Sequence, residues 1–263
     1  MKSSDIALDK TIKLFVYGDP GSGKTTLCGS ACDLPVEGGV MLLNIGGNPQ
    51  SLRRNAKRPT IIDLDGTKDL NPIYSWLEAG QPKSHVFVGL AERAGITLTP
   101  PYHTVCCDTT TDLQRLVLSE RLGTQDKRPG EDLKKAEIQH WGEVLSITGL
   151  IVRRFYKLPL NVIFTAQERI DKDEFTGIMS YQPGLWGQSR SEAPAYSLLT
   201  GRMMRLNRVP LKQRNELDGD THSVIAFDAI GQFLAKDQYG TVPKVMADPT
   251  FTKIWQSVYT EPT

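Results

Sequence analysis

The chain has few cysteines, no long apolar run and almost no excess of charge of either sign. Its 263 residues include four cysteines, and 31 Lys+Arg against 30 Asp+Glu leave a formal net charge of +1. No apolar stretch approaches the ~20 residues of a membrane span, and the first residues lack a signal-peptide core. The weak net charge excludes a protein that binds polyanions through its overall field, so nucleic acid would have to bind at local basic patches. We therefore expect a cytosolic protein with no membrane partner.

The cysteines and histidines lack the spacing of a metal site. Cys28 and Cys32 are four apart in a predicted helix, and Cys106 and Cys107 are adjacent in a predicted strand, so neither pair has zinc-site CxxC spacing. The four histidines show no HExxH or similar pattern. We expect reduced, buried thiols and no structural zinc.

The remaining composition is that of a globular α/β protein. Hydrophobic residues make up 39% of the chain, enough for a sizeable core, which excludes disorder. Strand and helix patterns alternate through the first two thirds, which predicts a mostly parallel wound sheet. The predicted strands are residues 12–17, 39–45, 60–64, 102–107 and 160–166, and the predicted helices are residues 23–32, 71–79 and 132–155. Residues 81–100 look like an insertion.

The last third has a different pattern. Residues 168–190 are expected to form a long polar connection that contains several aromatic residues. Short strands at residues 201–206, 223–227 and 233–235 predict an antiparallel β extension, and a final helix is expected over residues 249–259. We expect one domain over residues 1–263, with a core over about 11–200 and the extension with the final helix over about 201–260.

The sharpest motif follows the first predicted strand and precedes a helix. It matches G-x-x-x-x-G-K-[ST] and consists of Gly18, Asp19, Pro20, Gly21, Ser22, Gly23, Lys24 and Thr25, with Thr26 next in the chain. Glycines let the backbone wrap an anion closely, and inward N–H groups bind its oxygens. The pattern predicts a phosphate-binding P-loop in which Lys24 reaches the β- and γ-phosphates of ATP and the Thr25 hydroxyl holds Mg²⁺.

Two further strand ends carry polar side chains. Asp108 ends the strand at 102–107, where an acid could orient the water shell of the metal; its alternative role is to cap the following helix at residues 109–111. Gln167 ends the strand at 160–166, where it could sense the γ-phosphate.

Together these residues resemble the RecA-like P-loop ATPases, and in particular phage-encoded nucleotide-binding proteins of that group, some of which act in single-strand annealing and recombination. The matching segments are residues 18–25, 104–113, 162–168 and 233–240, in that order along residues 11–260. The resemblance implies an ATPase whose catalytic set is Lys24, Asp108, Gln167 and Lys236, with Thr25 and Asp108 (through water) at Mg²⁺. Lys236 would be a finger acting on a neighbouring subunit, which implies a ring or filament.

Two departures from the family pattern predict slow hydrolysis. RecA-like enzymes usually carry a catalytic glutamate just after the second strand, whereas residues 46–49 here contain no acid. Asp63, Asp65 and Glu168 are candidate substitutes, and the sequence selects none of them. Gln238 stands where the finger pattern has arginine. In GTPases, loss of such an arginine lowers the rate of hydrolysis by a factor of ~10³–10⁵.

The connection at 168–190 interleaves basic and aromatic residues, which suits single-stranded DNA. The candidates are Arg169, Lys172, Phe175, Tyr181, Trp186 and Arg190, with residues 121–131 as a second loop. The acids in the same connection leave a second interpretation open, a surface loop that packs its aromatics on the domain. Two basic clusters could bind nucleic acid or a neighbouring subunit: Arg53, Arg54, Lys57 and Arg58, and Arg202, Arg205, Arg208, Lys212 and Arg214.

Three functional hypotheses follow. The first is a RecA-like ATPase that acts on single-stranded DNA in recombination or annealing, with a replication motor or helicase loader as its variant. The second is a nucleotide-dependent assembly module with little hydrolysis. The third is a small-molecule kinase, which the antiparallel extension and Lys236 disfavour.

Overall fold

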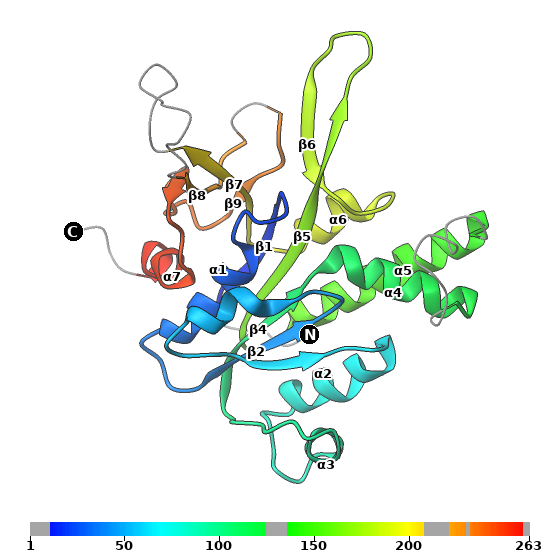
Figure 1. Cartoon of the computed structure of the whole chain (residues 1–263), viewed down its shortest axis with the longest axis vertical. Coiled ribbons are helices and arrows are strands. Elements are labelled where there is room, and N and C mark those ends of the chain that lie inside the picture. The colour runs from blue at the N-terminus through cyan, green and yellow to red at the C-terminus, as the bar shows by residue number, and fades with distance from the viewer. Residues whose placement is uncertain (1–10, 125–135, 208–220, 230–231, 260–263) are drawn as a thin grey trace, which may run out of the picture.

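The computed structural model describes residues 11–124, 136–207, 221–229 and 232–259, and its centre is one sheet (Figure 1). Six strands run parallel in the order β3-β2-β4-β5-β1-β7. Their bounds are β1 (Lys13–Gly18), β2 (Gly39–Asn44), β3 (Thr60–Asp63), β4 (Tyr102–Asp108), β5 (Asn161–Lys172) and β7 (Leu199–Asn207). The expected wound α/β sheet is confirmed.

Antiparallel strands follow β7 at the C-terminal end of the sheet, as expected. The strand expected at residues 201–206 as the first of the extension is β7, which pairs parallel with β1 and so belongs to the main sheet. Strand β8 (Thr221–Ala226) pairs with β7, and β10 (Val245–Ala247) pairs with β8. The strand expected at residues 233–235 is wrong in position, because β9 begins at Lys236 (Lys236–Asp237). Phe233 makes one isolated bridge, and the Leu234 carbonyl accepts a hydrogen bond from the Tyr17 hydroxyl instead of joining a ladder.

Helices cover both faces of the sheet because successive strand residues point to opposite sides. In β1, Phe15 and Tyr17 belong to the core under α2, α3, α4 and α5, whereas Leu14 and Val16 belong to the core under α1 and α7. The bounds of these helices are α1 (Lys24–Ser30), α2 (Leu70–Glu78), α3 (Val86–Arg93), α4 (Thr110–Leu122), α5 (Ile138–Tyr156) and α7 (Phe251–Tyr259); 3₁₀ turns are η1 (Ala31–Asp33), η2 (Pro49–Arg54) and η3 (Thr67–Asp69). The start of the helix expected at 132–155 falls partly outside the described residues.

Residues 168–190 are more regular than the expected polar connection. Strand β5 continues to Lys172, the chain turns, and β6 (Met179–Pro183) returns antiparallel to it, before helix α6 (Ser189–Ala195). The Asp173 carboxylate accepts hydrogen bonds from the amides of Phe175 (2.9 Å) and Thr176 (2.7 Å), and Gly177 has φ 70°. This turn chemistry makes residues 168–183 a hairpin, which projects beyond the other elements in Figure 1.

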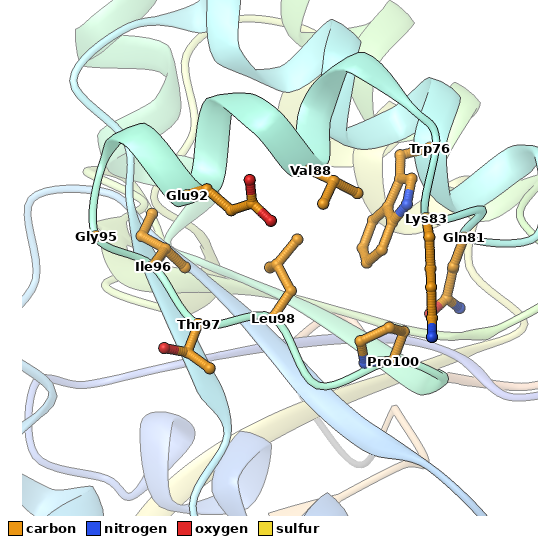
Figure 2. Close-up of a pocket in the computed structure, with 10 residues that line it drawn as sticks. All are labelled: Trp76, Gln81, Lys83, Val88, Glu92, Gly95, Ile96, Thr97, Leu98 and Pro100. Carbon is orange, nitrogen blue, oxygen red and sulfur yellow. The ribbon is translucent and has the colours of Figure 1, made fainter.

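The insertion at residues 81–100 contains α3 and encloses a cavity of about 420 Å³ (Figure 2). Its lining includes the apolar side chains of Trp76, Val88 and Leu98 and the charged side chains of Lys83 and Glu92. The insertion leads into the start of β4, so this cavity belongs to the amino ends of the strands. Within the described ranges, no helix combines the length and apolarity needed to cross a lipid bilayer.

Candidate functional site

Polar residues meet at the carboxyl ends of the parallel strands. The register pairs Gly18 with Gln167, and Asn44 with both Asp108 and Asp63. In each strand, the residue just before the polar one packs into the core under α2–α5. These residues are Leu43 before Asn44, Ile62 before Asp63 and Cys107 before Asp108. Because side chains alternate along a strand, these three point to the opposite face, the one that α1 covers.

The loop between β1 and α1 is wrapped around the Lys24 side chain. The Lys24 ammonium donates hydrogen bonds to the carbonyls of Gly18 (2.7 Å) and Asp19 (2.8 Å), and the residue is only 7% exposed. Burial lowers the pKa of Lys24, and the nearby carboxylates of Asp108, Asp19 and Glu168 act in the opposite direction. The carbonyl groups of the loop therefore hold one buried positive charge, the Lys24 ammonium.

The same loop fits an anion. Gly21 has φ +78° and a Cβ there would meet nothing within 4 Å, so the backbone borders open space. The Ser22 hydroxyl is buried and has no hydrogen-bond partner among the described residues, which leaves a polar group for a ligand. At Gly18, by contrast, a Cβ would lie 1.9 Å from the Met203 carbonyl oxygen. Asp19, Pro20 and Thr26 are exposed at the rim.

Asp108 is fixed by two hydroxyl groups. The Thr25 hydroxyl donates to one carboxylate oxygen (2.6 Å), and the Thr165 hydroxyl of β5 donates to the other. The alternative role as a helix cap is wrong, because Thr109 caps α4 by accepting a hydrogen bond from the Asp112 amide. Thr25 and Asp108, predicted from separate segments, thus lie in direct contact.

Gln167 lies within β5, beside Gly18 at the end of β1, and β5 lies between the strands of the P-loop and of Asp108. Its backbone amide donates to the Thr111 hydroxyl (3.0 Å), which ties it to α4. In the described part of the chain, no hydrogen bond holds its side-chain amide, so that group is available to a ligand.

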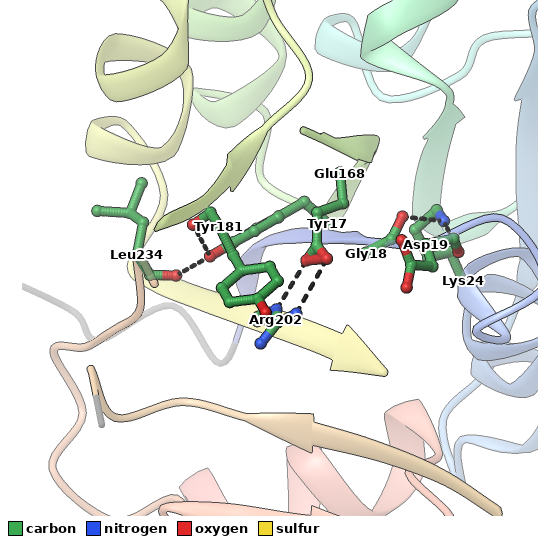
Figure 3. Close-up of polar contacts among 8 residues, drawn as sticks. All are labelled: Tyr17, Gly18, Asp19, Lys24, Glu168, Tyr181, Arg202 and Leu234. Atoms are coloured by element: carbon green, nitrogen blue, oxygen red, sulfur yellow. Dashed lines mark hydrogen bonds and ion pairs between the residues drawn. The ribbon is translucent and has the colours of Figure 1, made fainter. Parts of the chain in front are cut away.

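The Glu168 side chain points to the opposite face of the sheet from Gln167, and both of its carboxylate oxygens accept hydrogen bonds (Figure 3). Arg202 of β7 donates two hydrogen bonds to its carboxylate, Nε to Oε1 at 2.7 Å and Nη2 to Oε2 at 3.0 Å. The Glu168 side chain is 1% exposed. The Tyr17 hydroxyl donates nearby to the carbonyls of Leu234 (2.7 Å) and Tyr181 (3.2 Å). This carboxylate is thus a structural partner of Arg202.

Asn44 and Thr165 contact the acids of this site, although no sequence motif marks either residue. Asn44 is 6% exposed, and its amide nitrogen donates to Asp63 (2.5 Å) and to the Gly47 carbonyl (3.0 Å). The available signal is a polar residue at the last position of an apolar strand, separated only by Ile45 from Gly46 and Gly47. The strand predicted at 39–45 ends one residue later than β2, so it places Asn44 inside the strand and hides this signal.

Lys236 contacts its own chain. Its ammonium donates to the carbonyls of Ala195 (3.0 Å) and Ser197, and burial lowers its pKa. The backbone amide of Gln238 donates to the Leu198 carbonyl (3.0 Å). A role of Lys236 at a neighbouring subunit would require these bonds to break, and it stays a prediction.

The candidate DNA residues are divided between packed and exposed positions. Trp186 packs edge-on against Trp141, with ring centroids 4.7 Å apart, and Arg202 lies 3.7 Å above the ring of Tyr181. Asp171 accepts from Arg169 (2.6 Å) and lies 3.6 Å from Arg190. Lys172 and Phe175 are exposed on the hairpin, and the Phe175 side chain is 100% exposed.

The other basic segments are only partly described. Arg53, Lys57 and Arg58 are exposed around η2. Arg205 is exposed on β7, whereas Arg208, Lys212 and Arg214 lie outside the described residues, as does most of the loop at 121–131.

Comparison with known proteins gives a family, and it also finds solved structures of similar fold. No curated protein sequence matches the chain. Among solved structures, a KaiC-like protein from the hyperthermophilic archaeon Pyrococcus horikoshii is 11% identical, with a TM-score of 0.33; the match covers 82% of this chain and 78% of that one. A family model described as an AAA domain matches residues 10–239. With a P-loop that follows β1 and an acid at the end of β4, this chain belongs to the AAA domain family of P-loop ATPases.

Proposed function

We propose that the chain is an ATP- and Mg²⁺-binding RecA-like ATPase that acts on single-stranded DNA in phage-type recombination or annealing, as an oligomer. The observation that carries this proposal is one continuous strand. Strand β5 leaves the nucleotide edge at Gln167 and runs directly into the projecting hairpin. A group that responds to the γ-phosphate would therefore be separated from a DNA-contacting arm by only a few residues.

The nucleotide half rests on the loop and its neighbours. Lys24 supplies a buried ammonium, Ser22 an unpaired hydroxyl and Gly21 an open backbone position, which together suit the phosphates of ATP. Gln167 has a free amide at the same edge.

Thr25 and Asp108 would hold Mg²⁺, Thr25 directly and Asp108 through water. Hydroxyl and carboxylate oxygens are the hard ligands this ion prefers. When bound, the ion would neutralise charge on the transferring phosphoryl group. Asp108 would serve this role from a position already set by Thr25 and Thr165.

The DNA half rests on the hairpin. Phe175 at its tip is fully exposed, and Lys172 is exposed beside it. An exposed aromatic ring can stack on any base, and lysine favours phosphates. Arg169, Arg190, Tyr181 and Trp186 already have partners within the domain, so the proposal assigns the main contacts to the tip.

A second candidate function is a nucleotide-dependent assembly module with little turnover. The residue that ends β2 is the amide Asn44, with no acid in residues 46–49, and this favours slow hydrolysis. Self-association through Lys236 would serve either function.

Fluorescence anisotropy of labelled single-stranded DNA separates the two functions. The DNA is titrated with protein in four states: no nucleotide, ADP, ATP and a non-hydrolysable ATP analogue, with phosphate release followed in the same samples. The recombination ATPase predicts ATP-dependent binding and DNA-stimulated release. Nucleotide-dependent binding without release supports the assembly module, and no DNA binding in any state contradicts the DNA half.

A further inference from the structure

ATP hydrolysis requires a polar group that orients the attacking water, opposite the leaving ADP. The side chains available are those at the strand ends on the α1 side of the sheet. In the described residues these are Asn44, Asp63, Asp108 and Gln167. The residue that orients the water needs an acceptor atom that accepts no other hydrogen bond, and a side chain that its neighbours hold in one orientation.

Two acids are already committed elsewhere. Both oxygens of Asp108 accept hydrogen bonds, from Thr25 and Thr165. Glu168 points to the opposite face, where Arg202 occupies both of its oxygens. Both carboxylates therefore already accept hydrogen bonds at each oxygen, and neither is free to hold the attacking water.

Asn44 has both properties. It is the register partner of Asp108, and neighbouring strands lie about 4.8 Å apart. Its amide nitrogen donates to Asp63 and to the Gly47 carbonyl, so both of its N–H bonds are used. These two bonds fix the plane of the amide, and its Oδ1 accepts no hydrogen bond from any described residue.

We propose that Asn44 orients the attacking water through Oδ1, and that Asp63 is the positioning residue that fixes the Asn44 amide. This inference rests on the proposed ATPase function. The water oxygen bonds to the γ-phosphorus, the bond to the β–γ bridging oxygen breaks, and ADP leaves with the electron pair. One water proton stays on the new P–OH and the other moves to a phosphate oxygen, so ATP⁴⁻ and H₂O give ADP³⁻ and H₂PO₄⁻. Asn44 accepts a hydrogen bond and takes no proton, which makes turnover slow.

The direct test measures binding of two phosphate analogues. ADP with aluminium fluoride mimics the transferring group with water in line, whereas ADP with beryllium fluoride mimics the bound γ-phosphate before attack. In Asn44→Ala and Asp63→Ala, we expect affinity for the aluminium complex to fall by about tenfold or more, with affinity for the beryllium complex within about twofold of wild type. Asp63→Asn keeps an acceptor for Asn44 and should restore wild-type behaviour, and Asp65→Ala is the matched acid control.

Turnover gives an independent readout. The exchanged pair N44D/D63N keeps a hydrogen bond between the two positions but moves the carboxylate one strand closer to Asp108. A carboxylate is a general base, so this variant should exceed the wild-type kcat by about tenfold or more. In Asp63→Ala, kcat should fall while KM changes little.

Equal affinity of wild type and Asn44→Ala for the aluminium complex overturns the inference, as does an N44D/D63N kcat no higher than wild type. Thermal unfolding shows whether each variant folds; because Asp63 is exposed, Asp63→Ala carries the test if Asn44→Ala does not fold. If wild type binds neither ATP nor the beryllium complex, the proposed function itself fails. If wild type binds the beryllium complex, and Asn44→Ala binds the aluminium complex as tightly as wild type does, only this inference fails.

Discussion

Glu168 and Arg202 form a two-bond ion pair that spans the end of β1, from β5 on one side to β7 on the other. Arg202 also lies over the ring of Tyr181, at the base of the hairpin. The pair therefore links β5, which leads into the hairpin, to β7, across the strand that leads into the P-loop.

Breaking this pair should be costly, because Glu168 would be left buried and unpaired. We expect Arg202→Ala to lower the free energy of unfolding by about 3–5 kcal/mol, measured by urea denaturation. The exposed Arg169–Asp171 pair is the control, and Arg169→Ala should cost less than about 1 kcal/mol. Similar losses in the two variants would show that the Glu168–Arg202 pair is not important for stability.

Two glycines of the P-loop should respond differently to alanine. A Cβ at Gly18 would lie 1.9 Å from the Met203 carbonyl, so Gly18→Ala should prevent folding or lower the unfolding temperature strongly. A Cβ at Gly21 meets nothing, and the cost of its positive φ is about 1 kcal/mol, so Gly21→Ala should fold and lose nucleotide affinity. Circular dichroism melts and nucleotide titrations check both; a stable Gly18→Ala would contradict the close approach of β1 and β7.

The sequence predicted the P-loop and Asp108 because both rest on local patterns that end strongly apolar strands. It missed the hairpin because its turn depends on Asp173 and Gly177 inside a segment of mixed polarity. Glu168 was one of three candidate bases, and only the pairing of β5 and β7 on either side of β1 shows that Arg202 occupies it. The Asn44–Asp63 contact likewise depends on which strands are neighbours, which spacing along one chain does not encode.

The hairpin tip should matter for DNA and not for stability. Phe175→Ala should leave the unfolding temperature unchanged and weaken single-stranded DNA binding by about 1–3 kcal/mol, the worth of one stacked base. Trp186→Ala removes the contact with Trp141 and should instead lower the unfolding temperature. Anisotropy and melting curves on both variants check this, and unchanged DNA affinity in Phe175→Ala would exclude the tip as a stacking site.

His103 should make stability depend on pH. Burial lowers its pKa in the folded state below the ordinary 6.5, so the unfolded chain binds the proton more readily. Above about pH 6.5 the lowered pKa does not change the free energy of unfolding. Below that pH, protonation of the unfolded chain lowers this free energy. His103→Gln should therefore show a smaller loss of stability between about pH 8 and pH 5 than wild type, measured by urea denaturation. An equal loss would assign the dependence to other groups.

The central claim is that the loop around Lys24 binds the phosphates of ATP. Titration of a fluorescent ATP analogue with Mg²⁺ into wild type and Lys24→Ala tests it most directly, with melting curves to show that both proteins fold. The account predicts an affinity loss of about 100-fold or more in Lys24→Ala, since a charge-assisted contact to phosphate disappears. Equal affinities in two folded proteins would contradict it.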